Sequence, residues 1–222
     1  MFKIEELKRA AEGLKNKKAP GLDQIPNEVV KIVVKEIPDV VLTVLNKCLV
    51  QGKFPKEWKK AKLVLIPKPS KHETSIKYRP LSLLSTMGKL YERLIENRLR
   101  IEIEDKGGMS DTQFGFRKQR STIDALQKVM DIVEKAKKGS YGSKNLCVMI
   151  VFDVKNAFNT ARWNKIVEAL EKLKVSRYLI NIIKNYLQDR IIIVGDENKE
   201  IETKVGVPQG SVLGPLLWNV FL

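Results

Sequence analysis

Residues Val148 to Trp163 read VMIVFDVKNAFNTARW. The apolar run from Leu146 to Phe152 has the length and composition of a buried strand, and it ends at a single carboxylate, Asp153. A carboxylate at the mouth of a buried strand is costly unless it is solvated, paired or bound to a metal. The stretch therefore predicts one of two things at Asp153: an ordinary cap or surface ion pair, or a ligand for Mg²⁺.

A two-ion site would need more than Asp153. Enzymes that transfer phosphoryl groups often hold two divalent ions roughly 3.5–4 Å apart. At that separation the ions repel by about 17 kcal/mol at an effective dielectric near 20. One carboxylate and a triphosphate suit a single ion, so a pair of ions requires a second protein acid. No other acid follows a similar strand, because Asp196 and Glu197 fall in the expected turn of a hairpin.

The composition indicates a folded, basic protein. Of 222 residues 43% are hydrophobic, enough for one large or two small domains with a proper core. Lys and Arg number 41 against 26 Asp and Glu, a net charge of +15. This favours a polyanion partner, nucleic acid first and an acidic membrane second, with a merely Lys-rich soluble protein as the plain alternative.

Several site classes find little support. The single histidine, His72, excludes an imidazole metal cluster, and Cys48 and Cys147 lie far apart in apolar stretches that suggest core positions rather than a disulfide or a zinc site. No apolar run approaches the length of a membrane span, and the first residues lack a signal-peptide pattern. We expect a soluble, intracellular chain that does not bind a membrane.

Helices and strands are predicted without strict alternation, which favours an α+β fold over a doubly wound sheet. Helices are expected over 4–14, from an Asn27 cap, from Pro38 to a stop at Gly52, from about Lys89, after Ser121, over 164–173 and 176–187, and in the apolar tail. Strands are expected over 62–69 and 146–152, with a hairpin formed by 190–196 and 199–205.

Six stretches together resemble the reverse transcriptases of non-long-terminal-repeat retrotransposons. VFDVKNAFN resembles their first metal motif, and GVPQGSVLGPLLWN their Pro-Gln-Gly motif. FPKEWKKAKLVLIPKP, YRPLSLLSTMGKLYERLIENRL and QFGFRKQRSTIDAL resemble their fingers motifs, and NKKAPGLDQIPNEVVK resembles a segment upstream of them. The stretches occur in the family's order and cover nearly the whole chain. A group II intron or telomerase relative shares the palm motifs, but the KAPG and YRP segments favour the retrotransposon.

The resemblance implies an incomplete right-hand polymerase fold: an upstream segment and fingers over 1–145, and the first half of a palm over 146–222. It implies an RNA-directed DNA polymerase with an RNA template, a DNA primer, deoxynucleoside triphosphates and two Mg²⁺ ions in the complete enzyme, in the nucleus. It assigns no oligomeric state.

The resemblance also implies roles for particular residues. Asp153 and the Val154 backbone match metal ligands, Phe158 the ring that rejects a 2′-hydroxyl, Gln209 and Gly210 the contacts to nucleotide and template, and Lys68 and Arg79 the cations on the triphosphate. Gly115 and Arg117 match the template side, without assigned chemistry. On the residues alone each has a plain alternative: core packing for Phe158, solvated charges for Lys68 and Arg79, and an ordinary turn for Gln209 and Gly210.

One feature of the family is missing from this sequence. The second metal motif, an aromatic-Ala-Asp-Asp hairpin, follows the Pro-Gln-Gly motif in the family, and no such run occurs up to Leu222. We therefore expect this chain alone to be inactive as a polymerase. The alternative function is a non-catalytic remnant that binds nucleic acid through its basic fingers.

Overall fold

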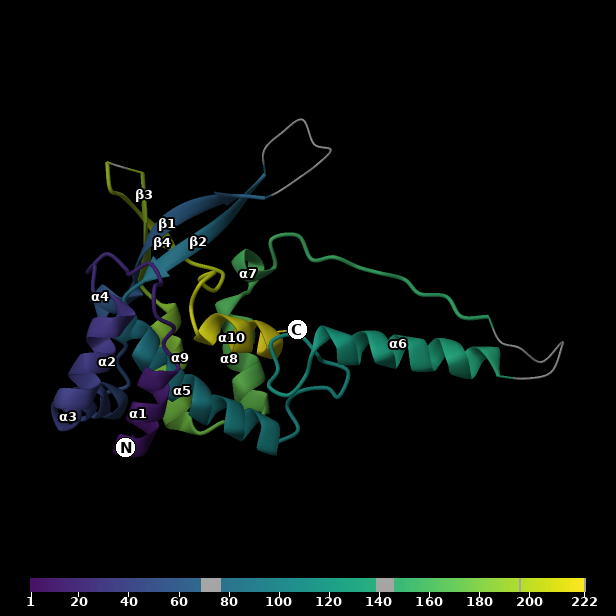
Figure 1. The fold of residues 1–222 in the computed structure, drawn as a ribbon, viewed down its shortest axis with the longest axis horizontal. Coiled ribbons are helices and arrows are strands. Elements are labelled where there is room, and N and C mark those ends of the chain that lie inside the picture. Colours follow the sequence, from purple (N-terminus) through teal and green to yellow (C-terminus); the bar gives the residue numbers. More distant parts are fainter. Residues whose placement is uncertain (69–76, 139–145, 196, 222) are drawn as a thin grey trace.

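The computed structural model describes residues 1–68, 77–138, 146–195 and 197–221, and Figure 1 shows their arrangement. His72, Pro69 and Asp196 lie outside the described residues. The helices are α1 (Ile4–Glu12), α2 (Asn27–Glu36), α3 (Pro38–Val50), α4 (Lys56–Lys59), α5 (Thr86–Asp105), α6 (Thr122–Lys137), α7 (Ala157–Thr160), α8 (Trp163–Lys172), α9 (Arg177–Leu187) and α10 (Leu213–Phe221). The strands are β1 (Lys60–Pro67), β2 (Tyr78–Leu84), β3 (Arg190–Val194) and β4 (Lys199–Thr203).

The four strands form one mixed sheet in the order β2-β1-β3-β4, above a body of helices (Figure 1). β1 pairs antiparallel with β2, Ala61 facing Leu84, and parallel with β3, Lys60 facing Ile191. β3 and β4 form the hairpin predicted around residues 190–205. The prediction of a mixed α+β fold is confirmed, as is a strand ending near the prolines after Ile66.

Local signals placed most helices correctly. α6 begins at the expected cap, where the Ser121 hydroxyl accepts from the amide of Asp124 and the Asp124 carboxylate accepts from the amide of Ser121. α5 begins at Thr86, three residues before the expected start, because Ser85 caps it. The prediction that Asn27 caps α2 is wrong. Pro26 occupies the cap position, and Asn27 is buried, its amide donating to the Lys15 carbonyl oxygen over 2.6 Å.

A cluster of aromatic rings forms the centre of the core. The Phe54 ring lies 5.3 Å from the Tyr91 ring and 5.0 Å from the Tyr186 ring, with Trp58 at its edge. The surrounding apolar cluster includes buried residues from both sides of position 145, such as Leu94 of α5 and Leu216 of α10. No helix in the described part of the chain is long and apolar enough to cross a bilayer.

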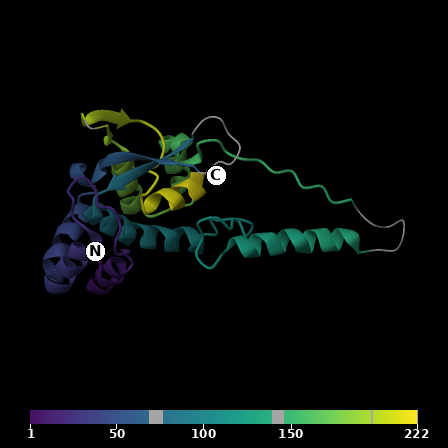
Figure 2. The same ribbon diagram turned by 45° about the horizontal axis from the view of Figure 1, so that its top comes forward.

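The prediction of a buried strand over 146–152 is wrong. These residues form no strand in the structure, and Val148 and Phe152 are 81% and 87% exposed. Cys147, expected in the core, is exposed as well. The segment returns from the outer end of α6, and both extend away from the body (Figures 1 and 2). A strand needs hydrogen-bonding neighbours, and the described part of the chain supplies none here.

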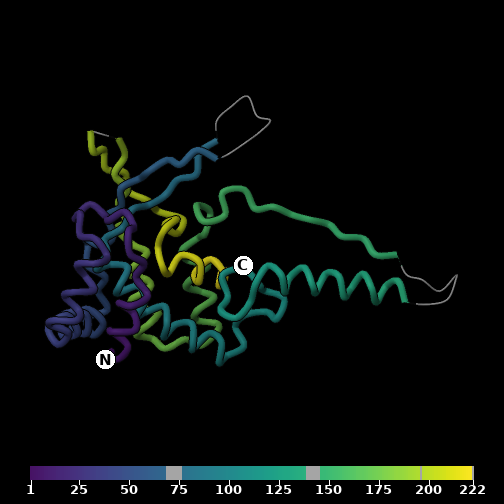
Figure 3. The backbone as a smooth tube through the Cα atoms, viewed as in Figure 1, coloured from purple at the N-terminus to yellow at the C-terminus, as the bar shows by residue number. Residues whose placement is uncertain are grey.

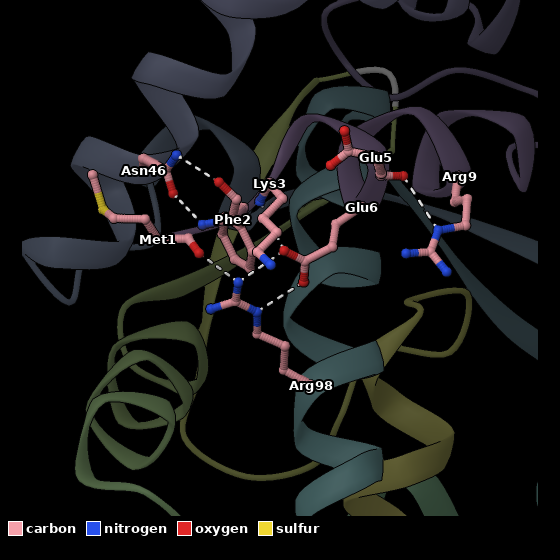
Figure 4. Close-up of polar contacts among 8 residues, drawn as sticks. All are labelled: Met1, Phe2, Lys3, Glu5, Glu6, Arg9, Asn46 and Arg98. Atoms are coloured by element: carbon pink, nitrogen blue, oxygen red, sulfur yellow. Dashed lines mark hydrogen bonds and ion pairs between the residues drawn. The ribbon is translucent and has the colours of Figure 1, made fainter.

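Hydrogen bonds near the N-terminus join the upstream helices α1 and α3 to each other and to α5. Arg98 of α5 donates to both carboxylate oxygens of Glu6 at 2.9 Å and to the Met1 carbonyl oxygen at 2.6 Å, and it stacks over the Phe2 ring (Figure 4). The side chain of Asn46 in α3 accepts from the Phe2 amide and donates to the Phe2 carbonyl oxygen. The backbone trace shows α1 between α3 and α5 (Figure 3). Residues 1–50 therefore share the core of the following elements.

We expect the Glu6–Arg98 contact to contribute acid-sensitive stability. The Arg98 guanidinium lowers the pKa of Glu6 below its usual 4.5. A lowered folded-state pKa gives stability that is present above 4.5 and is lost as pH falls through the folded value. Glu6→Gln should cost about 1 kcal/mol at neutral pH and flatten the acid limb of the stability curve. Urea titrations from pH 3 to 7 test this, with the exposed neighbour Glu5→Gln as control. An equal change in that control would contradict the assignment.

Candidate nucleotide and nucleic-acid site

The two motifs that the sequence singles out in the C-terminal part are joined through their backbones. The Val207 amide donates to the Phe158 carbonyl oxygen, and the Gly206 amide to the Ala161 carbonyl oxygen, each over 2.8 Å. The Trp163 indole nitrogen donates to the Gly206 carbonyl oxygen over 2.7 Å. A side chain at Gly206, whose φ is +85°, would approach backbone atoms of 158–159 to 3.0 Å. Glycine is therefore required where the segments meet.

The turn at Gln209 and Gly210 docks on strand β2. The Ser82 amide donates to the Gln209 carbonyl oxygen over 2.7 Å. Gly210 has a φ of +120°, and a Cβ built on it would lie 2.7 Å from the Ser82 carbonyl oxygen. The close backbone approach expected at Gly210 is thus made to the chain itself, through β2. The Gln209 side chain is half-buried and lines a cavity of about 430 Å³ beneath the sheet.

Lys68 and Arg79 lie towards the outer end of the β1–β2 hairpin. Arg79 faces Ile66 across the hairpin, and the Lys68 amide donates to the Lys77 carbonyl oxygen over 2.8 Å. Both side chains are exposed. Arg79 is three residues along β2 from Ser82, or about 10 Å of strand. The structure therefore puts both cations on the same hairpin that holds the Gln209–Gly210 turn.

Phe158 belongs to α7 and is half-buried among other rings. Its ring lies 5.7 Å from that of Phe116 and 6.0 Å from that of Trp218 in α10. It also packs against the apolar core. The position of Phe158 thus fits both core packing and the exclusion of a 2′-hydroxyl, since the ring contacts the core on one side without being enclosed by it.

Asp153 and Val154 lie in the exposed segment before α7. The described residues include no group of three or more His, Cys, Asp or Glu side chains placed to bind a metal ion. With a triphosphate, the single carboxylate of Asp153 fits one Mg²⁺ ion. It does not fit two, because the second ion would have no protein acid to offset the repulsion.

A basic cavity of about 430 Å³ lies beside Gly210, between the α1–α2 connection and β2. Its cations are Lys15, Lys18, Lys89 and Arg93, and no acidic side chain from the described residues lines it. Burial lowers the pKa of Lys89, and the buried Nε of Arg93 has no hydrogen-bond partner within the described structure. The arrangement suits an anion that several cations can share.

A third cavity, of about 510 Å³, lies between the loop before α6 and that helix. Its charged lining consists of the cations Arg117, Lys118, Arg120 and Lys128 and the acids Glu104, Asp124 and Asp131. The Arg117 guanidinium also donates to the Ser110 carbonyl oxygen over 2.7 Å. The Gly115 carbonyl oxygen accepts from the Asn219 amide of α10 over 2.9 Å. Gly115 thus holds the loop to the body, and Arg117 faces the cavity.

Sequence reasoning missed three buried charges near the turn: Lys59, Glu92 and Arg190, at 2%, 0% and 3% exposure. A signal existed for Glu92, because it precedes Ile95 by three residues and Leu99 by seven, the spacing of one helix face. Both of those residues are fully buried. No such periodicity was available for Lys59, the last residue of the four-residue helix α4, or for Arg190, the first residue of β3.

The chain matches a known family and several named proteins. The family described as reverse transcriptase (RNA-dependent DNA polymerase) matches residues 66–222. The chain is 36% identical over 99% of its length to a probable RNA-directed DNA polymerase from transposon BS of Drosophila melanogaster. It is 34% identical over 98% of its length to the RNA-directed DNA polymerase from mobile element jockey of the same species.

A more distant relative is the Pol polyprotein of the type-1 retrotransposable element R2 from Popillia japonica, 26% identical over 98% of the chain. The chain covers 24% of the BS and jockey proteins and 29% of the R2 protein. It therefore spans about a quarter of the length of the curated relatives it matches. Residues 1–65, outside the family match, align with these relatives too.

Proposed function

The chain belongs to the reverse transcriptase family, and from that premise we propose that it is the part of a retrotransposon RNA-directed DNA polymerase that contacts nucleotide and template. In this proposal residues 1–145 are the upstream segment and fingers of a right-hand polymerase, and 146–222 are the first half of its palm. The partners are an RNA template, a DNA primer and deoxynucleoside triphosphates. The nuclear location that the resemblance implies is part of the same proposal.

The observation that carries this proposal is the backbone junction of three segments. Val207 bonds to Phe158, and two residues later Gln209 bonds to Ser82 of the β1–β2 hairpin. One short stretch, 206–210, thus ties the α7 segment to the hairpin that carries Lys68 and Arg79. Groups that act on one nucleotide must be held in a common geometry, and this junction supplies one.

Each side chain has a role in this proposal that its chemistry allows. Lys68 and Arg79 hold the triphosphate, because an ammonium and a guanidinium donate charge-assisted hydrogen bonds to phosphate oxygens. Phe158 excludes a 2′-hydroxyl by its volume, and the Gln209–Gly210 turn borders the nucleotide and template. Asp153 and the Val154 backbone would hold a Mg²⁺ ion, which when bound would offset phosphate charge.

The basic cavity beside Gly210 offers a path for template phosphates. Lys15, Lys18, Lys89 and Arg93 surround it, and it opens next to the turn proposed to border the template base. A nucleic-acid backbone carries one charge per nucleotide, so a row of cations can track it without reading its sequence.

We expect residues 1–222 alone not to polymerise, since one suitable carboxylate cannot offset two divalent ions. The measurement is primer extension with oligo(dT) on poly(rA) and Mg²⁺, with a chain extended through an Ala-Asp-Asp motif as the positive control. Template-dependent incorporation by residues 1–222 that Asp153→Ala abolishes would contradict this expectation.

We expect the chain to bind RNA or a primer–template duplex weakly and with strong salt dependence. If about 6 phosphates are neutralised, log K against log salt should have a slope of about −4 to −5. Lys18→Ala, in the basic cavity, should reduce the slope by about 1. Lys35→Ala on α2 removes the same charge outside that cavity and should change it less. A flat titration, or equal effects of both variants, would count against the proposed interface.

The alternative proposal is a remnant that binds nucleic acid without turnover. The observation that favours it is the single carboxylate at Asp153 with no cluster of acids among the described residues. The two proposals differ for the chain extended through the second metal motif: restored extension supports the polymerase, and binding without extension supports the remnant.

A further inference from the structure

Glu92 of α5 has no part in the roles proposed above, yet its carboxylate contacts the start of α10 directly. Its Oε2 atom accepts hydrogen bonds from the amide of Val212 over 2.7 Å and from the amide of Leu213 over 3.0 Å. The side chain is fully buried. The first amides of a helix have no partners within the helix, so a buried acceptor at this position fixes where the helix begins.

These two amides follow the Gln209–Gly210 turn immediately. Just before them, the Ser211 amide donates to the Pro208 carbonyl oxygen over 3.2 Å, and the Ser211 hydroxyl accepts from the Gly214 amide over 2.8 Å. Hydrogen bonds from two other elements therefore hold the turn in place. Ser82 of β2 holds it at Gln209, and Glu92 of α5 holds it two residues after Gly210.

A buried carboxylate is an expensive way to cap a helix. Burial raises the pKa of Glu92, against the hydrogen bonds from the two amides and the nearby charges of Arg190 and Lys89. Arg190 is itself buried, 4.6 Å above the Tyr186 ring, and its Nη2 and the Glu92 Oε1 lack hydrogen-bond partners among the described residues. Such buried charges commonly add nothing to the free energy of unfolding, or lower it. A buried carboxylate at this place has a reason if it fixes the position of the turn.

We propose that Glu92 is a positioning residue that sets the place of the Gln209–Gly210 turn relative to the β1–β2 hairpin, and with it the nucleotide site. This inference rests on the proposed function, because only a nucleotide gives the position of that turn a consequence. The carboxylate acts by accepting the amides of Val212 and Leu213, and it contacts no substrate.

The test compares three variants of the full 222-residue chain. Glu92→Leu keeps most of the volume and removes the acceptor, whereas Glu92→Gln keeps one acceptor oxygen. Glu96→Leu is the matched control, since Glu96 is also buried on α5 but pairs with Arg100 and not with the amides after the turn. Amide hydrogen exchange by NMR gives the local readout. Displacement of a fluorescent analogue by dTTP, with Mg²⁺ on poly(rA)/oligo(dT), gives the nucleotide affinity.

In Glu92→Leu we expect the Val212 and Leu213 amides to exchange at least about tenfold faster and dTTP to bind at least about tenfold more weakly, the factor that corresponds to about 1.4 kcal/mol. Glu92→Gln should stay within about threefold of wild type for both. Glu96→Leu should leave dTTP affinity unchanged, and it should speed exchange of the Val212 and Leu213 amides no more than that of the α5 core amides. If Glu92→Leu does not fold, the wild-type chain still decides the anchor: the two amides must be as protected as those of the α5 core.

Three results would overturn the inference. These are unchanged dTTP affinity in a folded Glu92→Leu, an equal loss in Glu96→Leu, or unprotected Val212 and Leu213 amides in the wild type. A wild-type chain with no affinity for dTTP would instead refute the proposed nucleotide site. In that case the exchange data would show separately whether Glu92 anchors the turn.

Discussion

Phe54→Ala should lower the free energy of unfolding by about 3–5 kcal/mol, the cost of removing a large buried aromatic side chain. Phe54 is 2% exposed, and its ring contacts those of Trp58, Tyr91 and Tyr186. Its amide also donates to the Asn185 side chain over 2.8 Å. The ring therefore joins the segment just before α4 to α5 and α9, and little around it can close a cavity. Urea denaturation followed by circular dichroism measures the effect.

The matched control is Phe152→Ala, the same substitution at a residue that is 87% exposed. It should change stability by less than about 0.5 kcal/mol, as surface substitutions usually do. The pair of variants tests where the core lies, since the sequence pattern alone expected Phe152 in a buried strand. A loss at Phe152 as large as that at Phe54 would show that the 146–152 segment packs against the body in solution.

Gly210→Ala should cost about 2–6 kcal/mol and weaken nucleotide binding. At a φ of +120° an alanine is strained, by about 1–3 kcal/mol. Its Cβ would also lie 2.7 Å from the Ser82 carbonyl oxygen, so the turn must move off β2, which adds about 1–3 kcal/mol. Faster exchange of the Ser82 amide and a lower dTTP affinity would report that movement.

Gly107→Ala separates strain from contact. Gly107 has a φ of +64°, and a Cβ there meets nothing within 4 Å. The control should cost about 1–2 kcal/mol through backbone conformation alone and leave both the Ser82 amide and the dTTP affinity unchanged. If Gly107→Ala lowered the dTTP affinity as much as Gly210→Ala, the loss in Gly210→Ala would follow from lower stability and not from the lost contact with Ser82.

Sequence patterns predicted the elements whose hydrogen bonds are local. The cap at Ser121, the proline at the start of α3 and the glycine after its end mark helices because each acts on the adjacent turn of backbone. The β3–β4 hairpin was equally accessible, since its strands are separated only by a short turn. The family motifs, read in order along the chain, were sufficient to predict the reverse transcriptase family that the comparisons then confirmed.

What the tertiary structure alone decided depends on residues distant in sequence. The run from Leu146 to Phe152 has the composition of a strand, but composition supplies no neighbour, and the described chain leaves it exposed. Helical spacing puts Glu92 on the buried face of α5, but its partner, the Val212 amide 120 residues away, is brought to it only by the fold. The Gln209–Gly210 turn takes its position from Ser82, more than 100 residues earlier in the chain. Contacts of this kind form between elements after they exist, so no local pattern encodes them.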